Sequence, residues 1–160
     1  FDWYIDPTSA PSISHMEATV RRLHKEKPVT AILGDYIQLF TGRGTKKNIQ
    51  RYEEVGEISA GCKGIVKDYG IPVIMLAQLQ RPEGGVYDRV EKKTITPKPQ
   101  LHNLRESGNI EQDADVVMAL YRNQEENSPK TEVIILKQKD GGLETINMSF
   151  KPECYTFTES

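Results

Sequence analysis

Two polar residues directly follow apolar runs, in positions where an open parallel sheet could use them for chemistry. Asp35 comes after the run at residues 29–34, and Gln78 comes after the run at residues 71–77. Open α/β sheets bind ligands at the carboxyl ends of their strands, so both side chains would lie at the binding edge. A carboxylate there can hold hydrated Mg²⁺, and an amide can contact a phosphate or orient a water. Both residues could equally well hydrogen-bond to nearby loops, and spacing alone does not decide between these readings.

Alternating strands and helices are predicted around Asp35 and Gln78. Short apolar runs predict strands at residues 1–5, 29–35, 71–77 and 115–121. The last three runs have the composition of strands buried on both faces. Apolar residues at helical spacing predict helices at about residues 13–26 and 48–69. Strands and helices in this order imply a parallel sheet with right-handed crossovers.

Local signals mark the ends of the two helices. Ser14 and Glu17 have the spacing of a capping box for the first helix, and Gly70 suits the end of the second. The three glycines within residues 48–69 each cost on the order of 1 kcal/mol relative to alanine, which packing must offset. The buried stripe of that helix is predicted to contain Ile49, Tyr52, Val55, Ile58, Cys62, Ile65, Val66 and Tyr69.

The rest of the chain predicts a loop, a helix start and a hairpin. Residues 81–100 are rich in proline, glycine and charge, which favours a mobile surface loop. Asn103 and Glu106 indicate a helix start with Asn103 as its cap. Residues 132–137 and 144–150 predict an antiparallel hairpin. The fold class is therefore predicted to be α/β, with a mostly parallel sheet, flanking helices and a C-terminal antiparallel hairpin.

Composition limits the kind of protein this can be. The 160 residues, 37% hydrophobic and 28% charged, predict one globular domain. No apolar run approaches the roughly 18 residues of a membrane span, and no leader-like pattern opens the chain, so we expect a soluble intracellular protein. Cys62 and Cys154 lack ligand spacing and are expected in a buried helix and in a strand, without a disulfide or a metal.

Charge argues against a uniformly basic nucleic-acid binder, because the net charge is −2. It leaves room for a local basic patch made of Arg43, Lys46, Lys47 and Arg51. Those residues fit either a second DNA-facing loop or a solvated helix start.

Four segments resemble, in order, the motifs of one family, the DnaB-like replicative DNA helicases. Residues 33–40 (LGDYIQLF) are similar to its Walker B segment, an apolar strand ending in Asp-Tyr-Leu-Gln-Leu, and residues 77–81 (AQLQR) to its Ser-Gln-Leu-Asn-Arg motif. Residues 104–115 (LRESGNIEQDAD) nearly reproduce the block Leu-Arg-Glu-Ser-Gly-x-Ile-Glu-Gln-Asp-Ala-Asp, and residues 137–141 (KQKDG) occupy the place of Lys-x-Arg-x-Gly. Over residues 1–160 the chain thus resembles the C-terminal portion of one RecA-like helicase motor domain, a partial P-loop NTPase fold from Walker B onward.

The resemblance implies roles for the nucleotide-site residues. Asp35 would help bind Mg²⁺ beside ATP, and Gln78 would couple the γ-phosphate to the DNA-binding elements. Lys137 and Lys139 would reach across a subunit interface to the γ-phosphate held by the neighbour. Without the resemblance, both lysines would be read as outward residues of an edge hairpin.

The resemblance also implies a DNA contact at Arg105, Glu106 and Gly108. These residues match positions that line a central channel and hold the backbone of single-stranded DNA without reading bases. On local pattern alone, Arg105 and Glu106 read as the solvated first turn of a helix.

Two departures from the family pattern qualify these roles. The sequence contains no Gly-Lys dipeptide, so the phosphate-cradling loop Gly-x-x-x-x-Gly-Lys-Ser/Thr is absent, and we expect the isolated chain not to hydrolyse ATP. Since the chain opens directly on a strand-like run, we expect a piece of a longer protein. Lys139 stands where the family usually has arginine, which gives up bidentate phosphate contacts.

The function implied is that of a hexameric replicative helicase that couples ATP hydrolysis to translocation on single-stranded DNA and to duplex unwinding. Its cofactors would be ATP and Mg²⁺, and its partners single-stranded DNA, identical subunits, a primase and a helicase loader, in the cytoplasm of a bacterium or of a phage-infected host. Two alternatives stay open: a RecA-like ATPase with a recombinase-like or regulatory duty, and a non-catalytic module for DNA binding or assembly.

Overall fold

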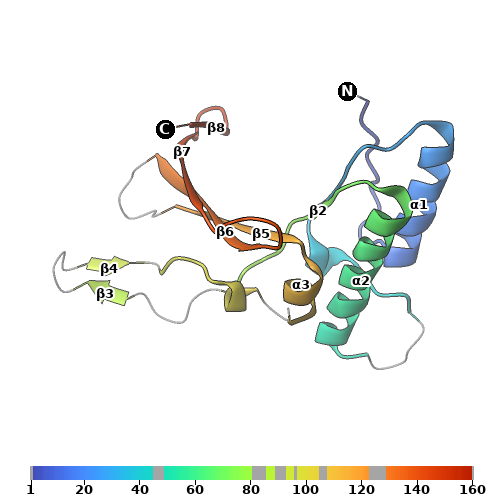
Figure 1. Cartoon of the computed structure of the whole chain (residues 1–160), viewed down its shortest axis with the longest axis horizontal. Coiled ribbons are helices and arrows are strands. Elements are labelled where there is room, and N and C mark those ends of the chain that lie inside the picture. Colours follow the sequence, from blue (N-terminus) through green and yellow to red (C-terminus); the bar gives the residue numbers. More distant parts are fainter. Residues whose placement is uncertain are drawn as a thin grey trace. The chain divides into compact units, whose positions relative to one another are not determined.

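The computed structural model describes residues 2–44, 49–80, 86–88, 93–95, 97–104, 108–122 and 129–159, and Figure 1 shows the elements they form. The chain divides into two compact units. The first comprises Phe1–Gln78 with Glu106–Ala114, and the second comprises Leu79–Arg105 with Asp115–Ser160. None of the helices in this described part is both long enough and apolar enough to cross a membrane.

The described part of the first unit has a small parallel sheet and helices. Its elements are α1 (Ile13–Glu26), β1 (Ile32–Gly34), η1 (Ile37–Leu39), α2 (Arg51–Tyr69), β2 (Val73–Met75) and α3 (Gly108–Asp113). The strands β1 and β2 pair in parallel, with Gly34 opposite Met75. Helix α2 carries the chain from one strand to the other (Figure 1), so the predicted strand–helix–strand order is confirmed here.

The core of the first unit lies where α1 packs against α2. Its buried residues are Ile13, Met16, Val20, Ile37, Phe40, Val55, Ile58, Cys62, Ile65 and Ile71. Fully burying one such aliphatic side chain stabilises the fold by roughly 1.5–3 kcal/mol. Gly61 permits the close approach of the two helices, because a Cβ at this position would lie 2.2 Å from Cγ1 of Ile13. Packing thus offsets the helix-propensity cost of that glycine.

The ends of the two long helices follow the predicted signals with two corrections. Helix α1 covers the predicted residues, but its cap is Ser12, whose Oγ accepts a hydrogen bond from the His15 N–H at 3.1 Å. Ser14 lies inside the helix and cannot cap it. Helix α2 ends as predicted at Gly70, which has φ 64° and ψ 26°. Tyr52 is 53% exposed rather than buried, because it lies in the first turn, away from the packed stripe.

The predicted strand at residues 1–5 is wrong for the residues described. Residues 2–5 form no strand, and Trp3 and Ile5 are 75% and 80% exposed. This segment is tied to α1 by side chains instead: the Arg22 guanidinium donates to the Tyr4 hydroxyl at 3.1 Å, and Lys27 pairs with Asp2. A strand needs a neighbouring backbone to pair with, and none is paired with these residues in the described part of the chain.

The described part of the second unit is an antiparallel structure. Its elements are β3 (Val86–Asp88), β4 (Lys93–Ile95), η2 (Leu101–Asn103), β5 (Val116–Tyr121), β6 (Lys130–Gln138), β7 (Thr145–Lys151) and β8 (Thr156–Glu159). The four strands β5-β6-β7-β8 form one sheet in that order. The predicted hairpin is confirmed as β6 and β7, which pair antiparallel with Val133 opposite Ile146.

The predicted mostly parallel sheet needs correction. Among the described strands, only β1 and β2 pair in parallel, while β5 pairs antiparallel with β6 in a separate sheet. The chain returns from β5 to β6 through a short polar stretch, and such a connection joins antiparallel neighbours. The side chains of β5 also alternate, with Met118 and Leu120 exposed and Val117 and Ala119 buried. The fold is therefore α/β with a small parallel sheet and a four-stranded antiparallel sheet.

Three local predictions in the second unit are also corrected. Residues 81–100 contain the antiparallel pair β3 and β4 and the approach to η2; the rest of the predicted loop falls partly outside the described residues. Asn103 does not cap a following helix, because its Oδ1 accepts from the Gln100 N–H at 2.8 Å. Cys154 lies exposed in a turn rather than in a strand, while Cys62 is buried in α2 as predicted; both are free thiols.

Candidate functional site

Asp35 and Gln78 follow the two parallel strands at their shared carboxyl edge. Asp35 comes directly after β1, and Gln78 lies three residues beyond β2. Backbone hydrogen bonds continue past the strands: the Leu76 N–H donates to the Gly34 carbonyl at 2.9 Å, and the Ile37 N–H donates to the Leu76 carbonyl at 2.8 Å. Both candidate side chains are exposed at this edge. Each is therefore accessible to a ligand at the end of the sheet.

Gln38 connects the two segments, a contact that sequence reasoning missed. Its Nε2 donates to the Gln78 carbonyl at 3.2 Å, and its Oε1 accepts from the Gln78 N–H at 3.1 Å. Gln38 lies in η1, just past Asp35, within the segment that resembles Walker B. Its place in that motif was the only available signal, because a bond from a side chain to a distant backbone leaves no periodic pattern.

Arg51 and Glu54, in the first turn of α2, hold the main chain of Gln38 in place. The Arg51 Nη2 donates to the Gln38 carbonyl at 2.7 Å, and the guanidinium pairs with Glu54. Glu54 also accepts from the Gly42 N–H at 3.0 Å. Desolvation acts to raise the pKa of Glu54, but the hydrogen bonds from Gly42 and Arg51 outweigh it and leave the pKa below 4.5. Glu54 is thus held as a carboxylate that anchors Arg51.

The predicted basic patch is divided between ion pairs where it is described. Arg43 pairs with Glu17 through two contacts, at 3.1 and 2.5 Å. Arg51 pairs with Glu54, as above. Lys46 and Lys47 fall outside the described residues. For these two arginines, the ion pairs favour an ordinary structural role over a role in a DNA-facing loop.

The predicted DNA-contact residues are described in part. Arg105 and Glu106 lie outside the described residues, whereas Gly108 is exposed and is the first residue of α3. Helix α3 packs beside α2 so closely that a Cβ at Gly56 would lie 2.3 Å from Nδ2 of Asn109. A shallow hollow between the two helices is lined by Glu53, Gly56, Glu57, Ala60, Asn109 and Asp113. Gly56 thereby sets how near α3 lies to α2.

Lys137 and Lys139 lie at the end of β6 in the second unit. Strand β7 pairs with β6 over Lys130–Ile134, and Lys137 lies beyond that stretch, where the described ladder joins β6 to β5, so the reading of these lysines as outward residues of a hairpin stays open. Lys137 is half-buried, opposite Val117. The Lys139 Nζ lies 2.7 Å from Oδ1 of Asp115, and the backbone N–H of Lys139 donates to the backbone carbonyl of Asp115 at 3.0 Å. Asp115 thus holds Lys139 at both ends, a contact that the sequence did not indicate.

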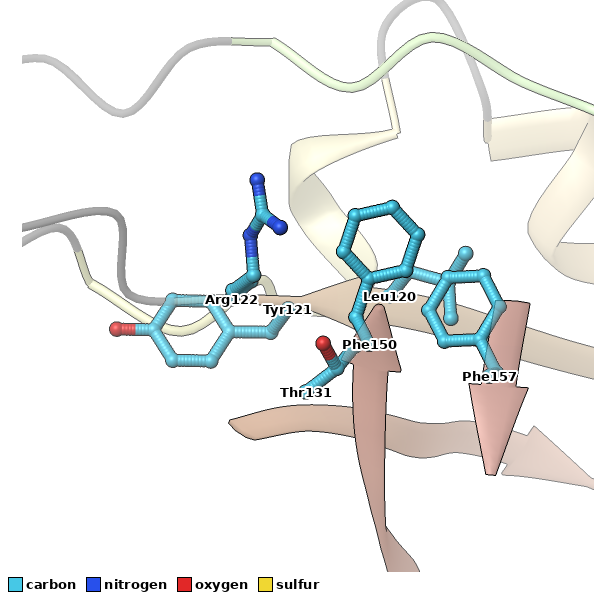
Figure 2. Close-up of a pocket in the computed structure, with 6 residues that line it drawn as sticks. All are labelled: Leu120, Tyr121, Arg122, Thr131, Phe150 and Phe157. Carbon is cyan, nitrogen blue, oxygen red and sulfur yellow. The ribbon is translucent and has the colours of Figure 1, made fainter. Parts of the chain in front are cut away.

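A separate apolar hollow of about 190 Å³ lies on the antiparallel sheet, and Figure 2 shows its lining residues. The rings of Phe150 and Phe157 lie 4.8 Å apart between centroids, and the Arg122 guanidinium lies 4.8 Å from the Phe150 centroid. The hollow is smaller than the roughly 300–1,000 Å³ of ordinary ligand pockets. Its described lining includes none of the predicted site residues.

The donor set at the strand edge suits Mg²⁺ better than a tightly ligated metal. The described residues contain no group of three or more side chains that could together hold a metal ion. A single exposed carboxylate such as Asp35 matches the way Mg²⁺ is bound beside nucleotides, where waters and phosphates supply most ligands.

Comparisons with known proteins point to one family. The chain is 41% identical over 159 residues to the replicative DNA helicase DnaC of Bacillus subtilis (strain 168), covering 96% of this chain and 33% of that protein. It is 39% identical over 159 residues to the replicative DNA helicase DnaB of Geobacillus stearothermophilus, with the same 96% and 33% coverage. The chain therefore spans about a third of the length of these relatives.

Comparisons with solved structures point to the same family. A DnaB-like replicative helicase, described together with its interactions with primase, superposes with a TM-score of 0.81 and 29% identity over 98% of this chain and 37% of that one. A second solved structure, an ATPase domain, superposes with a TM-score of 0.78 and 31% identity over 94% of this chain and 52% of that one. Residues 1–159 match the model of the DnaB-like helicase C terminal domain, and the chain belongs to that family.

Proposed function

We propose that this chain supplies the rear part of the motor domain of a hexameric replicative DNA helicase, which couples ATP hydrolysis to translocation on single-stranded DNA and to duplex unwinding. The observation that carries the proposal is the shared edge of β1 and β2, where Asp35 and Gln78 follow paired strands in a member of this helicase family. The similarity to named replicative helicases favours this function over a recombinase-like or regulatory ATPase.

At the nucleotide site, each residue of the strand edge has a separate task. Asp35 holds Mg²⁺, which when bound neutralises negative charge on the β- and γ-phosphates. Gln78 contacts the γ-phosphate and transmits its presence or absence along the segment that follows β2. Both tasks need exposed polar side chains at the carboxyl edge of the sheet, and both residues are exposed there.

At the DNA site, Arg105, Glu106 and Gly108 hold the phosphate backbone. The exposed glycine at the start of α3 lets main-chain N–H groups approach a phosphate closely. Contacts of this kind read no bases, so affinity for DNA should be independent of sequence and should fall steeply with salt.

The remaining contacts are made between subunits. Lys137 and Lys139 reach the γ-phosphate of a neighbouring subunit, so hydrolysis requires a ring. A structure similar to this chain was described with its interactions with primase, which supports a primase as a partner of the full-length protein. A helicase loader is a further partner, and the work takes place in the cytoplasm of a bacterium or of a phage-infected host.

The proposal is tested in the full-length protein with Arg105→Ala. We expect basal ATPase to stay measurable and stimulation by single-stranded DNA to be lost, because the guanidinium that senses the DNA backbone is removed. Arg21→Ala, at an exposed position on α1, is the matched control and should keep full stimulation. Unchanged stimulation in Arg105→Ala would contradict the DNA-contact role.

Strand displacement then separates the alternatives. A helicase unwinds a forked duplex with ATP, and Asp35→Asn removes both unwinding and hydrolysis. ATPase activity without unwinding would instead favour a recombinase-like or regulatory duty. DNA binding without any hydrolysis in the full-length protein would identify a non-catalytic module.

A further inference from the structure

We propose that Gln38 is a positioning residue for hydrolysis, which acts by fixing the main chain of Gln78 at the strand edge. The inference rests on the proposed role of Gln78 at the γ-phosphate and assigns a task to a residue that the motifs leave without one. It starts from the paired contacts of the Gln38 carboxamide, one to the Gln78 N–H at 3.1 Å and one to the Gln78 carbonyl at 3.2 Å.

These contacts extend the parallel ladder beyond the end of its strand. Leu76 uses both backbone groups toward the β1 segment, donating to Gly34 and accepting from Ile37. Two residues further on, Gln78 has the same orientation and needs the same two partners. The backbone of the β1 segment has by then turned into η1 and no longer runs alongside. The Gln38 side chain supplies a donor and an acceptor in the place of the missing peptide group.

Only a carboxamide of this length can make both bonds. A carboxamide carries an N–H donor and a carbonyl acceptor in a plane, as a peptide does. Glutamate would accept from the Gln78 N–H but would set a carboxylate oxygen against the Gln78 carbonyl. Methionine has a similar shape and makes neither bond. Since Gln78 is exposed, water can satisfy its backbone groups in such variants. The variants should therefore shift the position of Gln78 without unfolding the protein.

The first turn of α2 fixes the support itself. Arg51 donates to the Gln38 carbonyl at 2.7 Å and is held by Glu54. A continuous path of hydrogen bonds therefore runs from α2 through Gln38 to Gln78. In its proposed role, Gln78 must place its amide against a phosphate within a few tenths of an ångström. A main chain whose N–H and carbonyl are both bound by Gln38 fixes that position more precisely than one bound only by water.

The test is a double-mutant cycle in the full-length protein. We expect Gln38→Met to lower kcat for ATP hydrolysis about tenfold with little change in KM for ATP, as expected for a catalytic group displaced by a fraction of an ångström. Gln38→Glu, which keeps the bond to the Gln78 N–H but sets a carboxylate oxygen against the Gln78 carbonyl, should also lower kcat. In the Gln78→Ala background, Gln38→Met should cause no further loss, because the side chain it positions is gone. Lys67→Met, at an exposed site on α2, is the control and should match the wild type.

Each outcome bears on a distinct claim. Full activity in Gln78→Ala would overturn the proposed role of Gln78 itself. An impaired Gln78→Ala together with a fully active Gln38→Met, or losses that multiply in the double variant, would overturn the positioning role. If thermal unfolding shows that Gln38→Met is misfolded, Gln38→Glu decides: reduced kcat at an unchanged melting temperature supports positioning, and wild-type kcat overturns it.

Discussion

Ion pairs hold several of the described cations that the sequence marked as candidates for function. Three cations that the sequence placed on possible functional surfaces are each paired: Arg43 with Glu17, Arg51 with Glu54, and Lys139 with Asp115. Exposed pairs such as the last contribute only about 0–1 kcal/mol to stability. A phosphate can therefore draw Lys139 away from Asp115 at little cost, so the ion pair is compatible with a role at a neighbour's nucleotide.

Asp6 offers a test of local electrostatics. Hydrogen bonds from Thr8 and from His15 lower the pKa of Asp6 from 3.8 to about 2. A lowered pKa in the folded state means that ionised Asp6 stabilises the fold above about pH 3.8, and that this stabilisation is lost as the pH falls toward 2. We expect Asp6→Asn to lower the melting temperature by roughly a few degrees at neutral pH, with the difference vanishing near pH 2.

Melting curves between pH 2 and pH 7 measure this difference. Asp68→Asn, at an exposed position on α2, is the control for the removal of one carboxylate. A difference between Asp6→Asn and wild type that stays constant down to pH 2 would show that the contact stabilises by some means other than ionisation of Asp6.

At the scale of elements, the glycines of α2 have opposite roles. A methyl group at Gly61 would lie 2.2 Å from a buried atom of Ile13, whereas nothing lies within 4 Å of one at Gly64. Gly64→Ala should therefore stabilise the protein by about 0.5–1 kcal/mol through helix propensity. Gly61→Ala gains the same propensity but crowds the α1–α2 contact, so we expect a net loss of about 1–2 kcal/mol. Urea unfolding of the two full-length variants checks the signs, and stabilisation by both would contradict the packing.

The two long helices, set by local pattern, were predicted well, whereas the pairing of β5 was not. The periodic stripe of α1 and the left-handed Gly70 at the end of α2 are local signals, and both helices were found. The partner of β5 depends on pairing with another strand, and it was assigned to the wrong sheet. Strand β8 was missed because its turn uses Tyr155 at φ 50°, a conformation that sequence usually marks with glycine or asparagine.

At the scale of the whole molecule, the candidate site was predictable where an apolar run or a motif marked its residues. Asp35 and Gln78 were expected at one edge of a sheet from their places after two apolar runs, and the parallel pairing of β1 and β2 puts the ends of those strands together. Gln38 escaped prediction because its contact joins residues 40 positions apart through a side chain. The predicted roles of Arg105 and Glu106 stay predictions, since both lie outside the described residues.

Under the proposed function, each catalytic site would be shared between neighbouring subunits. Asp35 and Gln78 belong to the first unit, and Lys137 and Lys139 belong to the second. If the lysines act on a neighbour's nucleotide, no single chain has to bring all four residues together. The strand edge of one subunit and the β6 end of the next would then form each proposed site, with the lysines supplied in trans.

Mixing two inactive variants of the full-length protein tests this arrangement. Asp35→Asn abolishes the site of its own subunit, and Lys139→Ala abolishes the contribution to the neighbour's site. In a mixed ring, a Lys139→Ala subunit whose neighbour is Asp35→Asn has an intact site, so we expect ATPase activity to reappear on mixing. Rings of either variant alone should stay inactive. Activity that fails to reappear after subunit exchange is confirmed, for example by mass spectrometry of the mixed rings, would place Lys139 in cis or outside catalysis.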